Sequence, residues 1–228
     1  IGDPVIVGLP TYVGGLGAFR SYGAKMIGIP LDEEGMRMDE LEAKLEELKC
    51  QRQKPKFIYV VPDFQNPTGI TMSEARRLKL IELARAYDVL IVEDSPYKEL
   101  RYEGETRKSI FGLDGDGQVI GLHTFSKILF PGMRLGWMIA DEAVIQKMVI
   151  AKQSVDLCTP AFTQAIVAEF ASRGLLNEVI DNVKVIYREK RELMLSALDE
   201  HMRKLKGVSW TRPEGGLFLW LRLPEAID

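Results

Sequence analysis

Short apolar runs rich in β-branched residues alternate with longer segments of helical periodicity over most of the chain. Each run has the length and composition of a buried strand, and each ends in a polar loop. The predicted strands cover residues 5–9, 24–29, 57–61, 89–92, 118–125 and 135–140. A strand, a polar loop, a helix and a second strand form a βαβ unit, so this order favours a mostly parallel sheet.

Helical periodicity predicts helices between these strands. Leucines recur on one face of residues 39–48. The next helix runs to about residue 87, and Thr71 with Glu74 has the spacing of an N-terminal capping box. Glycines 14, 15 and 17 fit neither a phosphate loop nor a dinucleotide-binding loop, so we interpret them as the start of a helix with close backbone packing.

After residue 140 the pattern changes from alternating elements to helices. Residues 142–153 and 161–173 have helical spacing. One amphipathic pattern then runs from residue 175 to about residue 206, and we expect a helix with a bend in it. This helix is longer than is usual within a domain, which predicts that it connects two domains.

The last segment alternates again and predicts short strands at residues 208–211 and 217–221. We therefore predict an α/β fold, with a three-layer αβα sandwich around a mostly parallel sheet in residues 1–174. Residues 175–228 are predicted to hold the connecting helix and the start of a smaller α+β domain. The sequence has no initial methionine and stops within a strand pattern, so we expect both domains to be incomplete.

The composition is that of an ordinary soluble globular protein, with 46% hydrophobic and 28% charged residues. A net charge of -3 gives no reason to expect nucleic acid or an anionic membrane as a partner. No apolar run is long enough to span a bilayer, and no signal-peptide pattern opens the sequence. Cys50 and Cys158 lack metal-ligand spacing, so we expect no metal site and interpret both as buried thiols of a reducing compartment, the cytoplasm.

The turn between the predicted strands 118–125 and 135–140 carries the strongest chemical signal. Lys127 follows two hydroxyl side chains, Thr124 and Ser126, and Arg134 comes shortly after it. If the flanking strands are buried, the cost of burying a charged lysine favours the neutral, nucleophilic amine that a Schiff base needs. Arg134 could hold a phosphate by charge-assisted contacts and the two hydroxyls by donation. The turn therefore predicts a site for a cofactor that carries both an aldehyde and a phosphate.

Polar side chains follow three of the predicted strands. Asn66 lies in the loop after residues 57–61, Asp94 and Tyr97 follow residues 89–92, and Lys127 belongs to the turn just described. The ends of parallel strands share one edge of a sheet, where open α/β sheets bind ligands, so these residues can meet. Against pyridoxal phosphate, Lys127 would take the aldehyde and Asp94 would hold the ring nitrogen protonated. Tyr97 and Asn66 could hydrogen-bond the phenolate oxygen of the ring.

Three segments, PDFQNPTG, VEDSPYKELRY and TFSKILFPGMRLGW, resemble the signatures of the class I/II aminotransferases, which are fold-type-I enzymes that use pyridoxal phosphate. The closest resemblance is to the branch that holds 2-aminoadipate and aromatic aminotransferases. It implies transfer of an amino group from an L-amino acid to a 2-oxo acid such as 2-oxoglutarate, by a homodimer whose active site borrows residues from the partner. It also implies that Lys127 moves the proton at the substrate's α-carbon, that Asp94 and Tyr97 share in catalysis, and that Tyr12 stacks on the ring.

The resemblance also implies parts that residues 1–228 do not supply. The family has an upstream glycine-serine loop that grips the phosphate at a helix N-terminus. It also has an arginine in the small domain that binds the α-carboxylate of the substrate. Neither Arg212 nor Arg222 sits in the family's pattern for that role.

Two other functions remain open at this point. Some bacterial transcription factors carry an aminotransferase-like domain as a sensor behind a winged-helix DNA reader, and a basic helix-turn-helix upstream would identify that class. A lyase on the same scaffold would use the same cofactor residues, because these residues activate the cofactor and leave the choice of bond to the substrate clamp. The identity of the amino acid donor is not encoded in the residues singled out here.

Overall fold

The computed structural model describes residues 1–224, and residues 225–228, the last of the predicted small domain, lie outside the described residues. Its strands are β1 (Pro4–Leu9), β2 (Lys25–Asp32), β3 (Gly35–Met36), β4 (Phe57–Val60), β5 (Leu90–Asp94), β6 (Val119–Thr124), β7 (Gly136–Ile139), β8 (Ser209–Trp210) and β9 (Leu221–Arg222). Its α-helices are α1 (Val13–Ser21), α2 (Met38–Cys50), α3 (Glu74–Ala86), α4 (Ile110–Asp114), α5 (Glu142–Val155), α6 (Ala161–Ser172) and α7 (Leu175–His201).

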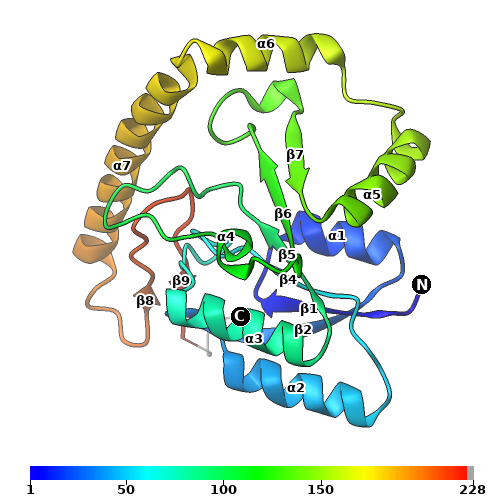
Figure 1. Cartoon of the computed structure of the whole chain (residues 1–228). Helices are drawn as coiled ribbons and strands as arrows, with labels where there is room; N and C mark the ends of the chain where they lie inside the picture. Colours follow the sequence, from blue (N-terminus) through cyan, green and yellow to red (C-terminus); the bar gives the residue numbers. More distant parts are fainter. Residues whose placement is uncertain (225–228) are drawn as a thin grey trace.

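The first seven strands form one sheet in the order β3-β2-β1-β4-β5-β6-β7 (Figure 1). The five strands from β2 to β6 in this order run parallel, and only β3 and β7 at the two edges run antiparallel to their neighbours. The predicted α/β fold with a mostly parallel sheet is therefore confirmed. Each parallel step is made by a crossover helix, which is why the apolar runs of the sequence are separated by helical patterns.

Helices cover both faces of this sheet. On one face, the buried leucines of α2 and α3 pack with Ile110 of α4 against Ile6, Ile58 and Ile91 of the strands. On the other face, α1 packs Leu16 and Phe19 against the opposite side chains of the same strands. Because side chains alternate between the faces of a strand, each central strand supplies both layers, and its sequence is apolar throughout.

The start of α1 explains the three glycines noted in the sequence. A Cβ atom on Gly14 would lie 2.3 Å from the ring of Tyr12, and one on Gly15 would lie 3.3 Å from the hydroxyl of Tyr59. The two glycines therefore leave room for two tyrosine rings beside the helix. The interpretation of close backbone packing is confirmed for these two positions, whereas a Cβ on Gly17 would meet nothing within 4 Å.

Helix α3 begins later than the predicted capping box requires. Its N-cap is Ser73, whose side chain accepts a hydrogen bond from the backbone N–H of Arg76. Thr71 lies outside the helix, and its hydroxyl accepts instead from the backbone N–H of Phe64. The predicted cap was wrong because Ser73 offers the same hydroxyl next to the first helical residue, where it reaches an unpaired N–H directly.

The outer edge of the sheet corrects another expectation. The segment 135–140 was predicted as a buried strand, but in β7 the side chains of Trp137 and Ile139 are exposed. Helix α5 buries none of its residues, and this edge is covered only in part within residues 1–224, where His123 and Phe125 pack against Trp137. Cys50 and Cys158 are also exposed free thiols, not buried ones. An apolar pattern predicts a strand, but it cannot say whether a second layer covers it.

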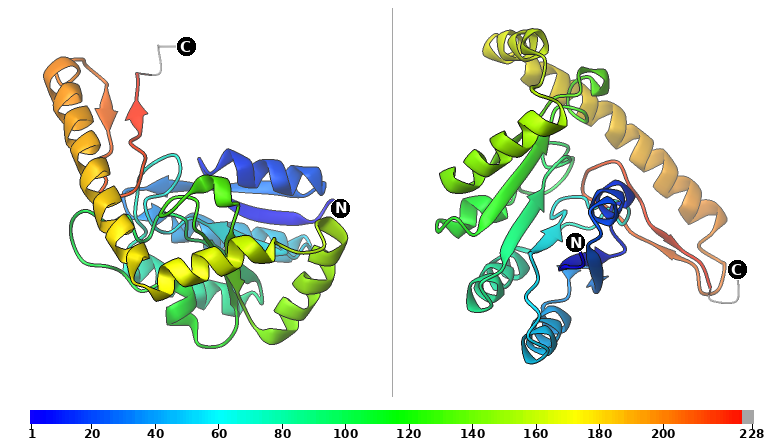
Figure 2. Two further views of the ribbon diagram at one scale, coloured as in Figure 1. Left: turned by 90° about the horizontal axis from the view of Figure 1, so that it is seen from above. Right: turned by 90° about the vertical axis from the view of Figure 1, so that its right-hand side faces the viewer.

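The long pattern after residue 174 forms one uninterrupted helix, α7, which ends at His201, earlier than predicted. Figure 2 shows this helix and the paired strands β8 and β9 side by side at one end of the sheet. Of the second tail strand, predicted at 217–221, only Leu221 is in a strand in the described structure, where it begins β9. No helix within residues 1–224 combines the length and apolarity needed to cross a membrane.

The tail packs against the loop that follows β4. Thr211 donates its hydroxyl to the carbonyl of Thr68 at 2.8 Å. Gly216 lies so close to Phe64 that a Cβ there would be 2.3 Å from the Cβ of Phe64. Tyr102 donates its hydroxyl to the carbonyl of Gly216, which fixes the same turn from the other side. The double glycine of the tail is thus required by this close approach.

Candidate active site

The predicted site residues follow four neighbouring strands at the carboxyl edge of the sheet. Tyr12 follows β1, Asn66 follows β4, and Asp94 is the last residue of β5. Thr124 is the last residue of β6, with Ser126 and Lys127 in the turn after it. The strand order reverses between β1 and β4, because the chain adds β2 on one side of β1 and β4 on the other. Ligands of open α/β sheets bind at such a switch point.

Gln65 joins the two loops at this switch point. Its side-chain amide donates to the carbonyl of Pro10 at 2.8 Å, and its oxygen accepts from the backbone and hydroxyl of Thr68 at 2.9 and 2.6 Å. The loop that carries Tyr12 and the loop that carries Asn66 are therefore held at a fixed spacing. Gln65 was not among the predicted site residues, although it is a polar residue among the turn formers of the Asn66 loop.

Asp94 is paired with a tyrosine that the sequence analysis also missed. The hydroxyl of Tyr59, in the middle of β4, donates to Oδ2 of Asp94 at 2.6 Å. Burial raises the pKa of Asp94 above its usual range, and the hydrogen bond from Tyr59 acts in the opposite direction. Burial and the neighbouring Asp94 raise the pKa of Tyr59 strongly, so the phenol stays a donor.

Tyr97 lies beside Asn66 and is almost fully buried, at 4% exposure. Burial raises the pKa of its hydroxyl to about 12, while a hydrogen bond with the Asn66 side chain opposes that rise. Asp94 and Tyr12 are close enough to raise this pKa further. The ring of Tyr97 packs edge-on against Phe218 of the tail, with centroids 5.4 Å apart. The structure therefore brings Tyr12, Asn66, Asp94 and Tyr97 together, with Tyr59 as a fifth member.

The turn after β6 holds the remaining predicted residues. The hydroxyl of Thr124 accepts from the backbone N–H of Ser126 at 3.1 Å and lies 3.0 Å from its hydroxyl. Arg134 has a left-handed backbone, with φ of 51°, and its exposed guanidinium donates to the carbonyl of Pro131 at 3.2 Å. The two hydroxyls and the arginine thus line one exposed turn.

Lys127 lies in this turn but is exposed, which corrects the expectation that flanking strands would bury it. The reason is its place in the sheet. It follows β6 beside the edge strand β7, whose own side chains are mostly exposed. Within residues 1–224, Lys127 is therefore not buried between strands in the way that the sequence pattern predicted.

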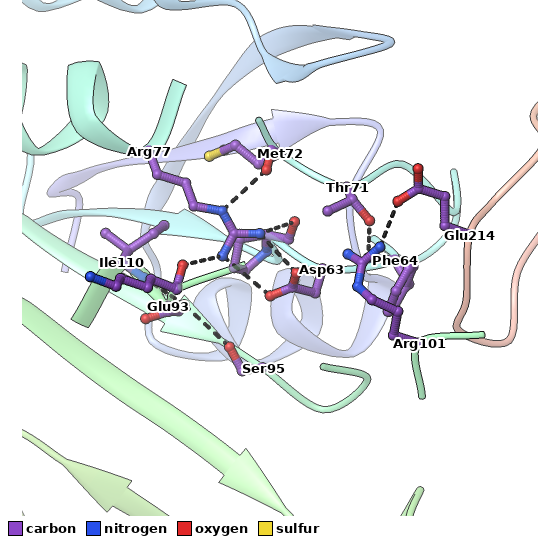
Figure 3. Close-up of polar contacts among 12 residues, drawn as sticks. Asp63, Phe64, Thr71, Met72, Arg77, Glu93, Ser95, Arg101, Ile110 and Glu214 are labelled. Atoms are coloured by element: carbon purple, nitrogen blue, oxygen red, sulfur yellow. Dashed lines mark hydrogen bonds and ion pairs between the residues drawn. The ribbon is translucent and has the colours of Figure 1, made fainter. Parts of the chain in front are cut away.

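A buried ion pair between Arg77 and Asp63 holds the start of the loop that leads to Asn66 (Figure 3). Arg77 of α3 is 0% exposed and forms a two-point contact with Asp63, at 2.8 and 3.3 Å. It also donates to the backbone carbonyls of Pro62, Met72 and Lys108. All three nitrogens of the guanidinium therefore form hydrogen bonds, and these bonds join the loop that leads to Asn66 to the segment before α4. The sequence pattern indicated only a helical arginine here, with no sign of burial.

Glu93 supports the neighbouring loop in a similar way. It is 0% exposed and lies on the face of β5 opposite Asp94. It accepts from the backbone N–H of Ile110 at 3.0 Å (Figure 3) and from that of Phe111 at 2.8 Å. Burial raises its pKa, and these two hydrogen bonds oppose the rise. The carboxylate caps the start of α4 and so anchors the end of β5.

Two hollows of the described surface lie away from this edge. A cavity of about 420 Å³ lies between the tail strands and Gly69–Thr71, and another of about 470 Å³ lies between α7 and the tail. Neither is lined by Asn66, Asp94 or Lys127. The candidate site is therefore defined by the side chains that meet at the sheet edge.

Comparison with known proteins gives one family for the chain. The family model for aminotransferase class I and II matches residues 1–227. Among curated proteins, aromatic-amino-acid aminotransferase 1 of Thermococcus litoralis is 51% identical over 227 residues, covering 100% of this chain and 54% of that protein. A protein of Bacillus subtilis described as an uncharacterized HTH-type transcriptional regulator, YdfD, is 31% identical over 227 residues, covering 100% of this chain and 46% of that protein.

Solved structures agree. An α-aminoadipate aminotransferase from Thermus thermophilus, complexed with N-(5'-phosphopyridoxyl)-L-leucine, superposes with a TM-score of 0.91 at 38% identity. The match covers 100% of this chain and 57% of that chain. The chain therefore spans about half the length of the relatives it matches.

Proposed function

Because the chain belongs to the class I and II aminotransferases, we propose that the whole protein moves an amino group from an L-amino acid to a 2-oxo acid, with pyridoxal phosphate held through Lys127. The main support for this proposal is that Asn66, Asp94 and Tyr97 lie together at one edge of the sheet. The turn that contains Thr124, Ser126 and Lys127 follows the neighbouring strand β6 at the same edge. The identity of 51% to a named aminotransferase supports the same activity.

The donor set fits this cofactor. Asp94 offers a partly buried carboxylate, the group that pairs with a protonated ring nitrogen, and its Oδ1 is not the atom bound to Tyr59. Tyr97 and Asn66 offer a hydroxyl and an amide at neighbouring positions, suited to one ring oxygen. Thr124, Ser126 and Arg134 offer hydroxyls and a guanidinium, which are the donors that bind a phosphate dianion. When bound, pyridoxal phosphate supplies an electron sink for charge that develops at the substrate's α-carbon.

In this proposal each residue would have a defined role. The amine of Lys127 would hold the cofactor covalently at rest and would carry the proton at the substrate's α-carbon during transfer. The carboxylate of Asp94 would keep the ring nitrogen protonated, and Tyr97 with Asn66 would donate to the ring oxygen. Tyr12, whose side chain is 42% exposed, would stack on the ring. Thr124, Ser126 and Arg134 would hold the phosphate.

The sensor function is a weaker candidate. The identity to the Bacillus subtilis regulator is 31%, compared with 51% to the aromatic-amino-acid aminotransferase over the same 227 residues. The site residues themselves do not separate transfer from a lyase reaction, so the separation has to come from the products.

The remaining features of the whole protein belong to the same proposal. We propose a homodimer, which the family resemblance implies, and a division into a large domain up to residue 174 and a smaller one after it. We propose a cytoplasmic location, which the two free thiols support because exposed thiols persist in reducing compartments.

The direct test is a product assay. The whole protein should be incubated with pyridoxal phosphate, 2-oxoglutarate and a panel of aromatic, aliphatic and acidic amino acids. We expect glutamate and the matching 2-oxo acid to form in equal amounts with at least one donor. Ammonia or a cleaved side chain without glutamate would identify a lyase. Cofactor binding without any turnover would favour the sensor.

Two substitutions separate the electronic task from the binding task. Asp94→Asn keeps the shape but removes the charge, so we expect the deprotonation step to slow about 10²-fold with a small loss of cofactor affinity. Arg134→Ala should instead weaken cofactor binding about 10–100-fold, because it removes charge-assisted hydrogen bonds to the phosphate, and should spare the rate at saturation. Stopped-flow kinetics and cofactor titration measure the two effects. Equal effects of both substitutions on rate and affinity would contradict these roles.

A further inference from the structure

We propose that the hydroxyl of Tyr59 is a positioning group that holds the Asp94 carboxylate in one orientation and in its charged form. The inference deepens the proposed function and rests on it, since Asp94 is the residue assigned to the ring nitrogen. The hydroxyl donates to Oδ2 at 2.6 Å, the length of a strong hydrogen bond to a carboxylate. One oxygen of Asp94 is then committed to Tyr59, and Oδ1 remains available to a ligand.

The fold places Tyr59 for this task from three sides. In the sheet it pairs with Val92 of β5, two residues before Asp94, so its side chain lies beside the carboxyl end of that strand. Its ring packs edge-on against Phe19 of α1, with centroids 5.2 Å apart and planes at 75°. The missing side chain of Gly15 leaves the space that its hydroxyl occupies. Tyr59 is 3% exposed, so the hydroxyl cannot turn to water for a different partner.

The surroundings of Asp94 make this donor important. The titratable groups that interact with it are Tyr59 on β4 and Tyr97 in the following loop, and Tyr12 after β1 acts on both of these tyrosines; all three are phenols. Across the ladder on β6 its partner is Leu122, which is apolar. Burial raises the pKa of Asp94, and the hydrogen bond from Tyr59 is the influence that opposes it within residues 1–224.

The direction of the effect follows from these two influences. A hydrogen bond to the charged form of a carboxyl lowers its pKa, so removal of the Tyr59 hydroxyl leaves burial unopposed and raises it. Asp94 would then take up a proton at a higher pH as the solution is acidified. A protonated Asp94 cannot balance a positive ring nitrogen.

The experiment uses the whole protein without cofactor, labelled with ¹³C at the aspartate carboxyl groups. Asp94 is assigned by the signal that disappears in Asp94→Asn, and its titration is followed by NMR. In Tyr59→Phe the midpoint should rise by about one pH unit, as expected for loss of one charge-assisted hydrogen bond. The matched control is Tyr102→Phe, which removes another buried tyrosine hydroxyl, one that donates to the carbonyl of Gly216 in the tail and not to Asp94. Its Asp94 midpoint should stay at the wild-type value.

A second variant covers the case in which Tyr59→Phe does not fold. Gly15→Ala keeps the hydroxyl but presses a methyl group against it at 3.3 Å, so it should raise the same midpoint by a smaller amount. Pyridoxal phosphate affinity at neutral pH provides a further measurement, and it should fall about tenfold in Tyr59→Phe and by less in Tyr102→Phe.

An unchanged Asp94 midpoint in Tyr59→Phe, or in Gly15→Ala where only that variant folds, would overturn the proposal. Equal shifts in Tyr59→Phe and Tyr102→Phe would overturn it as well, since the effect would then be a general loosening. The titration is measured without cofactor or substrate. A protein that shows the shift but transfers no amino group therefore supports the role of Tyr59 while it contradicts the proposed function.

Discussion

Replacing Lys127 with alanine should lower the rate of amino transfer by the whole protein at least about 10³-fold. A positioned acid–base group contributes about 10²–10⁴-fold by itself, and the same amine is also proposed to hold the cofactor. Thr124, Ser126 and Arg134, which are proposed to bind the phosphate, remain, so the variant should still bind pyridoxal phosphate. Single-turnover kinetics with a competent donor amino acid measure the loss. Lys152→Ala is the matched control, because Lys152 lies on the surface of α5 and pairs with Asp156, and it should keep full activity.

Chemical mapping tests the same residue without kinetics. Borohydride treatment of the whole protein with bound cofactor should attach a pyridoxyl group to Lys127, and peptide mapping should recover it there. A label on Lys25, Lys98 or Lys152 would contradict the assignment of the site. The exposure of Lys127 in residues 1–224 makes this test necessary, because the burial that first suggested a nucleophilic amine is not present there.

Replacing Arg77 with methionine should lower the free energy of unfolding by about 3–5 kcal/mol, the usual effect of removing one partner of a buried ion pair. The substitution leaves the carboxyl group of Asp63, at 3% exposure, without its partner and removes one donor from each of three backbone carbonyls. Urea denaturation of the whole protein measures the change through the midpoint. The matched control is the adjacent Arg76→Met. Arg76 pairs with Asp32 near the surface, so its loss should reduce stability by about 1 kcal/mol at most.

A double variant identifies the cause. Arg77→Met combined with Asp63→Leu removes both charges, and apolar replacement of a buried pair is often neutral. We expect the double variant to be more stable than Arg77→Met alone. If the loss of stability in the double variant equals the sum of the losses in the two single variants, the unpaired buried charge does not explain the effect of Arg77→Met. The lost packing of the aliphatic part of Arg77 would then explain it.

The sheet was predictable because its signal is local. Each central strand is buried on both faces, so its apolar run is continuous, and the helices between them show their own period. The errors occur where the outcome depends on a second layer or on a near neighbour. The pattern at 135–140 could not reveal that β7 stays mostly exposed within residues 1–224, and Thr71 competed with Ser73 for one N-cap.

The site shows the same division. Asn66, Asp94, Tyr97 and Lys127 stand in polar loops, where a residue that is not needed for packing attracts notice. Tyr59 and Arg77 were missed because each occupies an ordinary position of its pattern, an aromatic in a strand and a basic residue in a helix. Their partners are set by strand register and helix packing. The register that places Tyr59 beside Val92 comes from contacts between segments that are far apart in the sequence.

The contacts between the tail and the Asn66 loop also determine when this loop becomes fully packed during protein synthesis. Thr211 and Thr68, joined by one hydrogen bond, are 143 positions apart. A ribosome that adds about 5–20 residues per second needs on the order of 10 s to make the intervening chain. For that time the nascent loop has its support from Arg77 below but no Gly216 against Phe64. The loop that carries Asn66 is therefore packed on both sides only when the tail has left the exit tunnel, and a stalled chain would expose a partly supported loop to chaperones and proteases.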